Sequence, residues 1–384
     1  MFADVIDIEA IRRDEFPITR AGIYLDNATL GPPPSRHVRA AGELLERMST
    51  YGLKDLFAIS EDGVDQVRMK AANLLNCEPK HVCFVRSTSQ GVNLVAEGLD
   101  WQGGDEVILY EVDHPAGVLP WLNLSDRGVK VRFVRDEGRN MFEPEDVLAL
   151  IGPMTRVVCV SLVNFAHGAR AKVESIASLC RARGIWFVVD AVQALGAIRV
   201  DTSSLGADIV VAHGYKFLLS GFGIGMCYCS DRALHELKVR QVGWHSFEKA
   251  FDLDRMLAFK LDLTAGAKRF EASFQPLPQV FGLGATLDLL AEVGAETVET
   301  RVLALARRLV AGLVERGYEV VGPQALKAES AIVSVEMRDD AQRARLEKGL
   351  QRSRTTCAIR QGRVRLSPHF YNTEEEVDAM LSCI

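Results

Sequence analysis

The segment Ile185-Trp-Phe-Val-Val-Asp-Ala-Val-Gln193 is a short apolar run that ends on a carboxylate and then turns polar. A run that is apolar at successive positions is typical of a strand covered on both faces, as in a parallel sheet. A helical pattern over 173–183 precedes it, and similar apolar runs recur along the chain. They lie at 82–85, 106–110, 129–134, 157–163, 208–212 and 224–229. This alternation predicts an α/β fold with a doubly wound, mostly parallel seven-stranded sheet.

The last of these strands is expected to run against its neighbour. Only a short stretch separates Ala212 from Ile224, and a crossover helix needs roughly ten or more residues plus its loops. We therefore predict that 224–229 is antiparallel to the strand before it.

A smaller α+β domain is expected beyond about Arg255. A long helical pattern covers 282–313 with a break near Gly294, and a final helix is expected at 374–381. Short strands are expected at 331–335 and 363–366. We predict a large domain over 21–254 and a small domain that combines 255–384 with the segment 1–20.

Composition narrows the function classes. Apolar residues make up 48% of the chain and charged residues 25%, as in ordinary globular proteins. The formal net charge of −6 argues against a nucleic-acid partner, which selects a basic surface. No apolar run approaches the ~18 residues of a membrane span, and no signal peptide is visible. Eight cysteines are too few for a disulfide scaffold, so we expect a cytoplasmic protein with buried thiols. The thiols expected to be buried are Cys83, Cys159, Cys227 and Cys229.

Polar residues follow several of the predicted strands, and ligands of open α/β sheets bind at the carboxyl ends of strands. Thr88 and Ser89 come after the strand at 82–85, where a helix begins. They are suited to cradle a phosphate, although ordinary helix capping explains them as well. Asp190 is suited to hold a cationic partner such as a protonated pyridine nitrogen, or to cap the next helix.

A lysine follows the strand at 208–212. Lys216 is either a solvated surface residue or an amine whose pKa is lowered by apolar walls and nearby cations. Taken together, the phosphate cradle, the carboxylate and the amine fit one cofactor, pyridoxal 5′-phosphate. Its aldehyde would join Lys216 and its ring nitrogen would pair with Asp190. The phosphate would be bound by Thr88, Ser89, His213 and Tyr215, with Gln193 on the same side of the ring.

Asp190-Ala-Val-Gln193 followed by His213-Gly-Tyr-Lys216 resembles the fold-type-I pyridoxal-phosphate enzymes. The closer resemblance is to the class V aminotransferases, with cysteine desulfurases, kynureninases and isopenicillin-N-epimerase-like proteins. It extends over nearly the whole chain. The other stretches that carry it are 24–28, 86–95, 113–121, 269–273, 282–285 and 365–376.

The resemblance implies further site residues and a homodimer. His114 would stack on the cofactor ring and take part in acid–base chemistry, Arg365 would receive the substrate α-carboxylate, and Asn27 lies in the motif near that carboxylate. Asn164 and His167 follow the strand at 157–163. Either side chain would reach the cofactor or the substrate, or would instead form hydrogen bonds with the backbone of its own loop. The alternative for His114 is a residue of a surface turn. The alternative for Arg365 is a solvated arginine in a surface ion pair.

The chain departs from the cysteine desulfurases at two places. Cys357 lies directly before a predicted strand, whereas the reactive cysteine of the desulfurases lies on a loop. This position favours a packed thiol over one that carries a persulfide. Phe274 stands where relatives often place a threonine that reaches the partner subunit's phosphate, and Ser273 is the available substitute.

The predicted reaction acts on an α-amino acid through a carbanion at Cα. We favour β-elimination with C–S cleavage of a cysteine-type substrate, and transamination or epimerisation remain open. A non-catalytic binding module on the same fold is the alternative of another class. No metal-binding spacing occurs among the histidines and cysteines, so we expect no metal. The segment Gly221–Gly225 lacks the spacing of a dinucleotide-binding loop.

Overall fold

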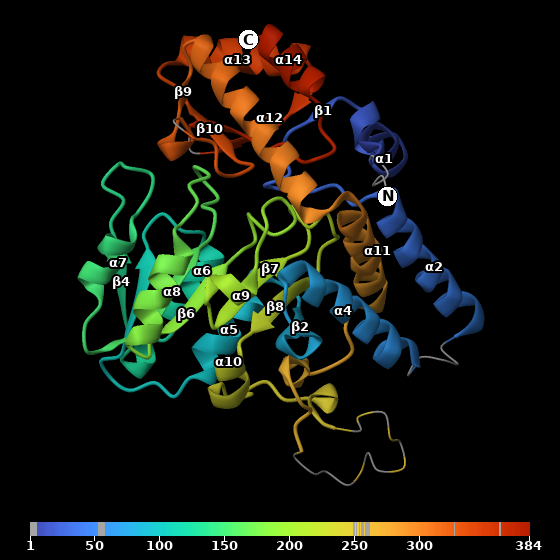
Figure 1. Ribbon diagram of the computed structural model, residues 1–384, viewed down its shortest axis with the longest axis vertical. Helices are drawn as coiled ribbons and strands as arrows, with labels where there is room; N and C mark the ends of the chain where they lie inside the picture. The colour runs from blue at the N-terminus through green and yellow to red at the C-terminus, as the bar shows by residue number, and fades with distance from the viewer. Residues whose placement is uncertain are drawn as a thin grey trace, which may run out of the picture.

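The computed structural model describes residues 6–52, 58–248, 250, 252, 254, 257, 262–325, 327–360 and 362–384. Its centre is a seven-stranded sheet in the order β2-β8-β7-β6-β5-β3-β4. The strands are β2 (Val82–Val85), β3 (Glu106–Tyr110), β4 (Lys130–Val134), β5 (Thr155–Ser161), β6 (Trp186–Asp190), β7 (Ile209–His213) and β8 (Gly225–Cys229). The predicted fold is confirmed (Figure 1).

Strand β8 is antiparallel to both of its neighbours, β2 and β7, whereas β3 to β7 pair in parallel. The prediction for 224–229 is therefore confirmed. The turn between β7 and β8 is too short for a crossover helix. It holds Lys216 at the edge where the parallel strands end.

Both faces of the sheet are buried. Val189 and Val210 pack into one apolar cluster, and Val188 and Ile209, their neighbours along the strands, pack into another on the opposite face. This explains the continuous apolar runs in the sequence. The helices around the sheet are α4 (Val64–Leu75), α5 (Thr88–Gly98), α6 (Pro115–Leu122), α7 (Pro144–Leu150), α8 (Val173–Ala182), α9 (Thr202–Leu205) and α10 (Asp231–Glu236).

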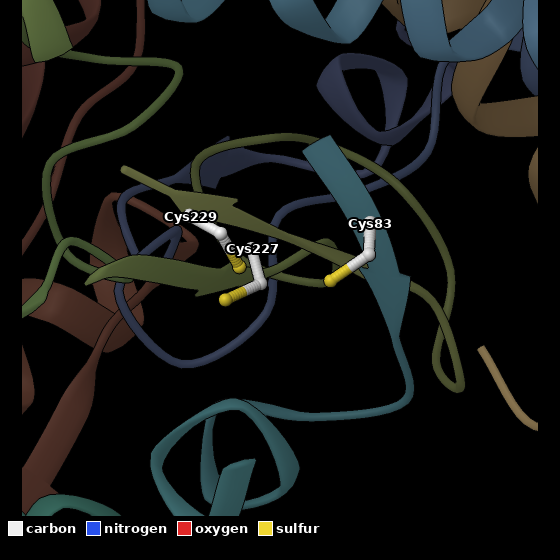
Figure 2. A group of neighbouring side chains, drawn as sticks. All are labelled: Cys83, Cys227 and Cys229. Atoms are coloured by element: carbon white, nitrogen blue, oxygen red, sulfur yellow. The ribbon is translucent and has the colours of Figure 1, made fainter. Parts of the chain in front are cut away.

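Three thiols meet inside one of these clusters. Cys83 on β2 lies directly opposite Cys227 on β8, and Cys229 is the next residue on the same face (Figure 2). Their sulfur atoms lie within 4.8 Å of one another, and all three side chains are fully buried. Cys159 is buried too, so the prediction of buried thiols is confirmed. All eight cysteines lie in the described part of the chain and none forms a disulfide.

The C-terminal lobe stands beyond one end of the sheet (Figure 1). It contains a four-stranded sheet in the order β12-β13-β10-β9. The predicted long helix is two helices, with Gly294 between them at a φ of +83°. Only glycine adopts that conformation without strain, so the predicted break is confirmed. The elements are α11 (Leu277–Val293), α12 (Ala295–Glu315), β9 (Glu319–Val320), β10 (Val333–Glu336), α13 (Asp340–Arg352), β12 (Ala358–Arg360), β13 (Arg363–Leu366) and α14 (Glu374–Ser382).

The N-terminal segment joins the two regions. After α1 (Ile8–Glu15), strand β1 (Ile23–Tyr24) pairs in parallel with β11 (Thr355–Thr356). Helix α2 (Ser35–Tyr51) packs along α11. The division at 21–254 and 255–384 remains a prediction. Among the described residues, no helix has the length and apolarity to cross a membrane.

Candidate active site

Lys216 is held at a fixed position by the chain segment that passes beneath it. The N–H group of Gly31 donates to the carbonyl oxygen of Tyr215 at 2.9 Å. A Cβ atom on Gly31 would lie 2.0 Å from the carbonyl oxygen of Lys216, so only glycine permits this approach. The Lys216 side chain is buried, at 7% exposure.

Asp190 and Lys216 are both buried, and the charge of each shifts the pKa of the other. Asp190 ends β6, and its Oδ1 accepts from the N–H of Val192 at 2.8 Å. Burial raises the pKa of Asp190 to about 7. Burial lowers the pKa of Lys216 to about 8, against the opposing attraction of Asp190. An amine with such a pKa is partly neutral near pH 7 and can act as a nucleophile or a base.

The predicted phosphate cradle lies between β2, α5 and β7. Ser87 caps α5 by accepting from the N–H of Gln90 at 3.2 Å, so capping does not occupy the two residues that follow. The Thr88 hydroxyl lies 3.0 Å from Nδ1 of His213, whose ring stacks on Tyr215 with centroids 3.8 Å apart. Burial lowers the pKa of His213 to about 3, so this ring is neutral at pH 7. Ser89, the next residue of α5, is half-buried.

Several buried polar atoms at this edge have no partner in the described part of the chain. They include Nε2 of His213 and Oε1 of Gln193. The amide nitrogen of Gln193 donates to the carbonyl oxygen of Ala28 at 3.2 Å, which fixes its side chain. Buried polar groups are normally paired, so an unpartnered donor and acceptor beside the Lys216–Asp190 pair fit a polar ligand. These residues fit pyridoxal 5′-phosphate.

His114 caps α6 and is held in one orientation. Its Nδ1 accepts from the N–H of Ala116 at 3.2 Å, which leaves the proton of the neutral ring on Nε2. The ring meets Phe165 edge to face, with centroids 5.1 Å apart. Burial, and then the charge of Lys216, lowers the pKa of His114 to about 4. The ring is therefore uncharged at pH 7.

Arg365 lies on β13 with 3% of its surface exposed. It donates to the carbonyl oxygen of Phe165 at 2.7 Å and to the hydroxyl of Thr29 at 2.6 Å. Its Nη2 lies 3.7 Å from Oδ1 of Asp26, and its Nε has no partner among the described residues. Burial lowers the pKa of Arg365 to about 10. The side chain lines a cavity of about 330 Å³.

The two predicted asparagines are engaged with the chain itself. Asn27 donates to the carbonyl oxygen of Ser367 at 2.8 Å and accepts from the hydroxyl of Tyr371 at 2.9 Å. Asn164 donates to the carbonyl oxygen of Val112 at 3.0 Å and accepts from the N–H of Ala166 at 2.8 Å. These bonds position the loops around Arg365 and His114. The substrate contacts of both asparagines remain predictions.

Cys357 and Phe274 are both packed against other side chains of the protein. Cys357 stands between β11 and β12 against the apolar cluster of the C-terminal lobe. Burial raises its pKa to about 12. The ring of Phe274 lies edge to face against His245, with centroids 4.3 Å apart. Whether Ser273 reaches a partner subunit remains a prediction.

Four residues at the site were not identified in the sequence: Asp26, Thr29, Gly31 and Arg360. The first three lie close to Asn27 within one segment, and that proximity is the signal that could have identified them. Arg360 precedes β13 at the rim of the same cavity.

Comparison with known proteins identifies the family. The family model "Aminotransferase class-V" matches residues 23–380. A probable cysteine desulfurase of Methanothermobacter thermautotrophicus is 29% identical over 97% of this chain and 96% of the relative. Another from Pseudomonas aeruginosa is 32% identical over 72% of this chain and 68% of the relative.

Solved structures share the fold. The apo structure of a cysteine desulfurase from Thermococcus onnurineus has a TM-score of 0.84 at 24% identity and covers 99% of this chain and 98% of its own. The cystine C–S lyase C-DES, in complex with its product cysteine persulfide, has a TM-score of 0.87 at 24% identity and covers 96% and 98%. With the family match over most of the chain and a buried lysine–aspartate pair at the predicted positions, this protein belongs to the class V aminotransferase family of pyridoxal-phosphate-dependent enzymes.

Proposed function

We propose that this enzyme catalyses β-elimination with C–S bond cleavage on a cysteine-type α-amino acid. The observation that carries the proposal is the burial of the Lys216 amine within the electrostatic influence of Asp190 and Arg365. Pyridoxal 5′-phosphate, when bound, supplies an electron-withdrawing ring that stabilises negative charge at Cα. Its proposed ligands are Thr88, Ser89, His114, Asp190, Gln193, His213, Tyr215 and Lys216.

Each side chain then has a defined task. Arg365 receives the α-carboxylate, because its guanidinium is desolvated and its Nε is without a partner among the described residues. The Lys216 amine, with its lowered pKa, removes the Cα proton. The carboxylate of Asp190 stabilises a protonated ring nitrogen across a dry site. His114 is the second acid–base group, neutral and with its proton on Nε2.

C–S cleavage by elimination needs no thiol from the enzyme. The sulfur leaves Cβ as a thiolate, and hydrolysis of the remaining fragment yields a keto acid and ammonia. This agrees with a Cys357 thiol that burial keeps protonated, with a pKa of about 12. The relatives named cysteine desulfurase and cystine C–S lyase support cleavage at sulfur.

The assay mixes purified holoenzyme with an S-substituted cysteine and measures pyruvate and free thiol together. Equal release of both supports the lyase. Conversion of the cofactor to its amine form, with a keto acid and no thiol, would instead establish a transaminase, and loss of optical activity alone an epimerase. In each case the holoenzyme must show the absorbance of an imine. Borohydride should bleach that absorbance, and the Lys216→Ala variant should lack it. A protein without that absorbance is a binding module.

We further propose a cytoplasmic homodimer. The eight unpaired cysteines are typical of a reducing compartment. The resemblance over 269–273 and 282–285 covers the segments that reach the partner subunit in the family. Sedimentation equilibrium tests the dimer, and a monomer at micromolar concentration rejects it.

A further inference from the structure

Three buried thiols meet at one point of the large sheet, away from the Lys216 side chain. Cys83 lies on β2, and Cys227 and Cys229 lie on β8. Figure 2 shows the sulfur of Cys83 directed from β2 toward the two sulfurs of β8. The three sulfur atoms lie within 4.8 Å of one another, and all three residues have 0% exposure. These three residues are the thiol cluster. Because its two strands are far apart in the sequence, cysteine spacing alone does not reveal it.

Packing accounts for a single buried cysteine more readily than for three that converge. A thiol behaves as a small apolar side chain, and Cys159 fills that role in the same apolar cluster without joining the other three. The sulfurs of the thiol cluster face one another instead, with Cys83 directly opposite Cys227. All three are free thiols, so no disulfide explains their approach. Converging sulfur donors are suited to a soft metal ion.

The spacing of the sulfur atoms fits a three-coordinate ion. With metal–sulfur bonds of about 2.3 Å, the sulfurs of a trigonal site lie about 4 Å apart. Sulfur atoms that already lie within 4.8 Å of one another reach this spacing by small movements of the side chains. Among the described residues no histidine or carboxylate completes the group, so a fourth protein ligand is missing. Structural zinc sites are four-coordinate, whereas thiolates also select the soft monovalent ion Cu(I).

The charge of a buried copper site can be balanced here. Each Cu–S bond to a thiolate replaces an S–H bond and releases one proton to solvent, and no electron is transferred. A Cu(I) ion with two thiolates and one thiol carries a single negative charge. The guanidinium charge of Arg269 acts on Cys229 and favours its thiolate form. Arg269 donates to the carbonyl oxygens of Gly266 and Leu234 and forms no ion pair within the described residues, so its charge is available for compensation.

We propose that the thiol cluster binds one Cu(I) ion in three-coordinate geometry and thereby cross-links β2 to β8. Strand β2 is at the edge of the sheet, and β8 is its one neighbour there. It leads into the turn that carries Thr88, a proposed phosphate ligand, so the ion fastens the strand that supports the phosphate cradle. The inference is independent of the proposed reaction, because no thiol of the cluster is a proposed ligand of cofactor or substrate.

The test measures Cu(I) binding by purified holoenzyme in the absence of oxygen. Iodoacetamide first alkylates the accessible thiols, and burial protects the thiol cluster. Cu(I), supplied as its acetonitrile complex, is then titrated in competition with bicinchoninate. We expect one ion per chain, and X-ray absorption spectroscopy should identify three sulfur ligands. Uptake should be slow, because the ion enters only when the structure opens locally, so each sample is incubated overnight. Zn²⁺ in place of Cu(I) should bind more weakly.

Two alanine variants test the assignment of the ligands. Loss of a group that only orients a metal ligand costs about 10–100-fold in affinity, so Cys227→Ala, which removes a ligand, should weaken Cu(I) binding at least about tenfold. Cys159→Ala is the matched control, since it makes the same change in the same apolar cluster but outside the thiol cluster. It should bind Cu(I) as the unmodified protein does. Circular dichroism checks that both variants fold.

The unmodified protein provides a test that needs no variant. Binding of less than one ion per chain after overnight incubation overturns the inference, as do nitrogen or oxygen ligands in the X-ray absorption spectrum. Zn²⁺ that binds more tightly than Cu(I) overturns the choice of ion. A folded Cys227→Ala variant with undiminished affinity overturns the assignment of the site. The three cysteines are then packed thiols that stabilise the sheet only by their apolar contacts.

Discussion

Gly31 and Lys216 are in backbone contact so close that a Cβ atom on Gly31 would lie 2.0 Å from the Lys216 carbonyl oxygen. Any side chain there must displace the loop that carries the amine. Gly31→Ala should therefore fold but lose about a hundredfold in kcat, the cost of a displacement near 1 Å. Steady-state kinetics and the imine absorbance measure it. Gly42→Ala is the control: a Cβ there meets nothing within 4 Å, and the change should stabilise α2 by about 0.5–1 kcal/mol. Comparable activity in the two variants contradicts the assignment.

Asp190→Asn should remove the charge opposite the cofactor ring without altering the size of the side chain. Because the buried carboxylate is the only group proposed to hold the ring nitrogen protonated, turnover should fall by about 10²–10⁴-fold. Pyruvate release measures this, and near-ultraviolet circular dichroism checks that the fold persists. A loss smaller than tenfold would assign Asp190 a structural role.

His369 predicts a pH dependence of stability. Its ring is fully buried, and its Nε2 lies 2.9 Å from the carbonyl oxygen of Phe217. Burial lowers the pKa of His369 to about 4. The unfolded chain takes up a proton below its ordinary pKa of about 6.5, whereas the folded chain does not until about pH 4. The unfolded state then binds more protons, so stability rises with pH across this window and is lost as the pH falls.

The measurement compares the unmodified protein with His369→Gln. Urea denaturation between pH 4.5 and 6.5 should show the stability difference, unmodified minus variant, increasing by up to about 1.4 kcal/mol per pH unit. Comparing the two proteins cancels the other titrating groups. Parallel pH profiles would show that the histidine is protonated in both states alike.

Arg68 and Glu271 predict a large loss of stability. Their buried ion pair, Nη1 to Oε1 at 2.5 Å, joins α4 to the segment before α11, and the same carboxylate accepts from the N–H of Phe84 at 2.7 Å. Glu271→Gln removes the buried counter-charge of this guanidinium and leaves it only the partly exposed Asp65, 3.1 Å from its Nε. The change should cost about 3–5 kcal/mol. Asp378→Asn, which breaks the exposed pair with Arg308, should cost about 0–1 kcal/mol. Chemical denaturation measures both, and similar losses would refute the distinction.

Cys357 should be dispensable for C–S cleavage. Its thiol is packed and its pKa is raised to about 12, so it is a poor nucleophile near pH 7. Cys357→Ala should retain thiol and pyruvate release from an S-substituted cysteine. Complete loss of sulfur release, with the imine absorbance intact, would show that the enzyme carries a persulfide as desulfurases do.

The strand ends could be read from local patterns, with small errors. Strand β5 covers Thr155–Ser161, whereas the apolar run predicted 157–163. The run is longer than the strand because Leu162 and Val163 stay buried after the ladder ends. The residue that caps helix α5 was harder to predict than the strand ends. Thr88, Ser89 and Ser87 are equivalent as caps in sequence, and only the backbone geometry assigns the cap to Ser87.

The sequence by itself determined the sheet, the antiparallel β8 and the position of Asp190 and Lys216 at the ends of neighbouring strands, because strand periodicity and the polarity of strand ends are local properties. Only the tertiary structure decided what surrounds Arg365. The hydroxyl oxygen of Thr29 accepts from that arginine across 336 residues of chain, and from Arg360 across 331. Such contacts depend on how the N-terminal segment crosses between the two sheets, a consequence of global packing that no local pattern encodes.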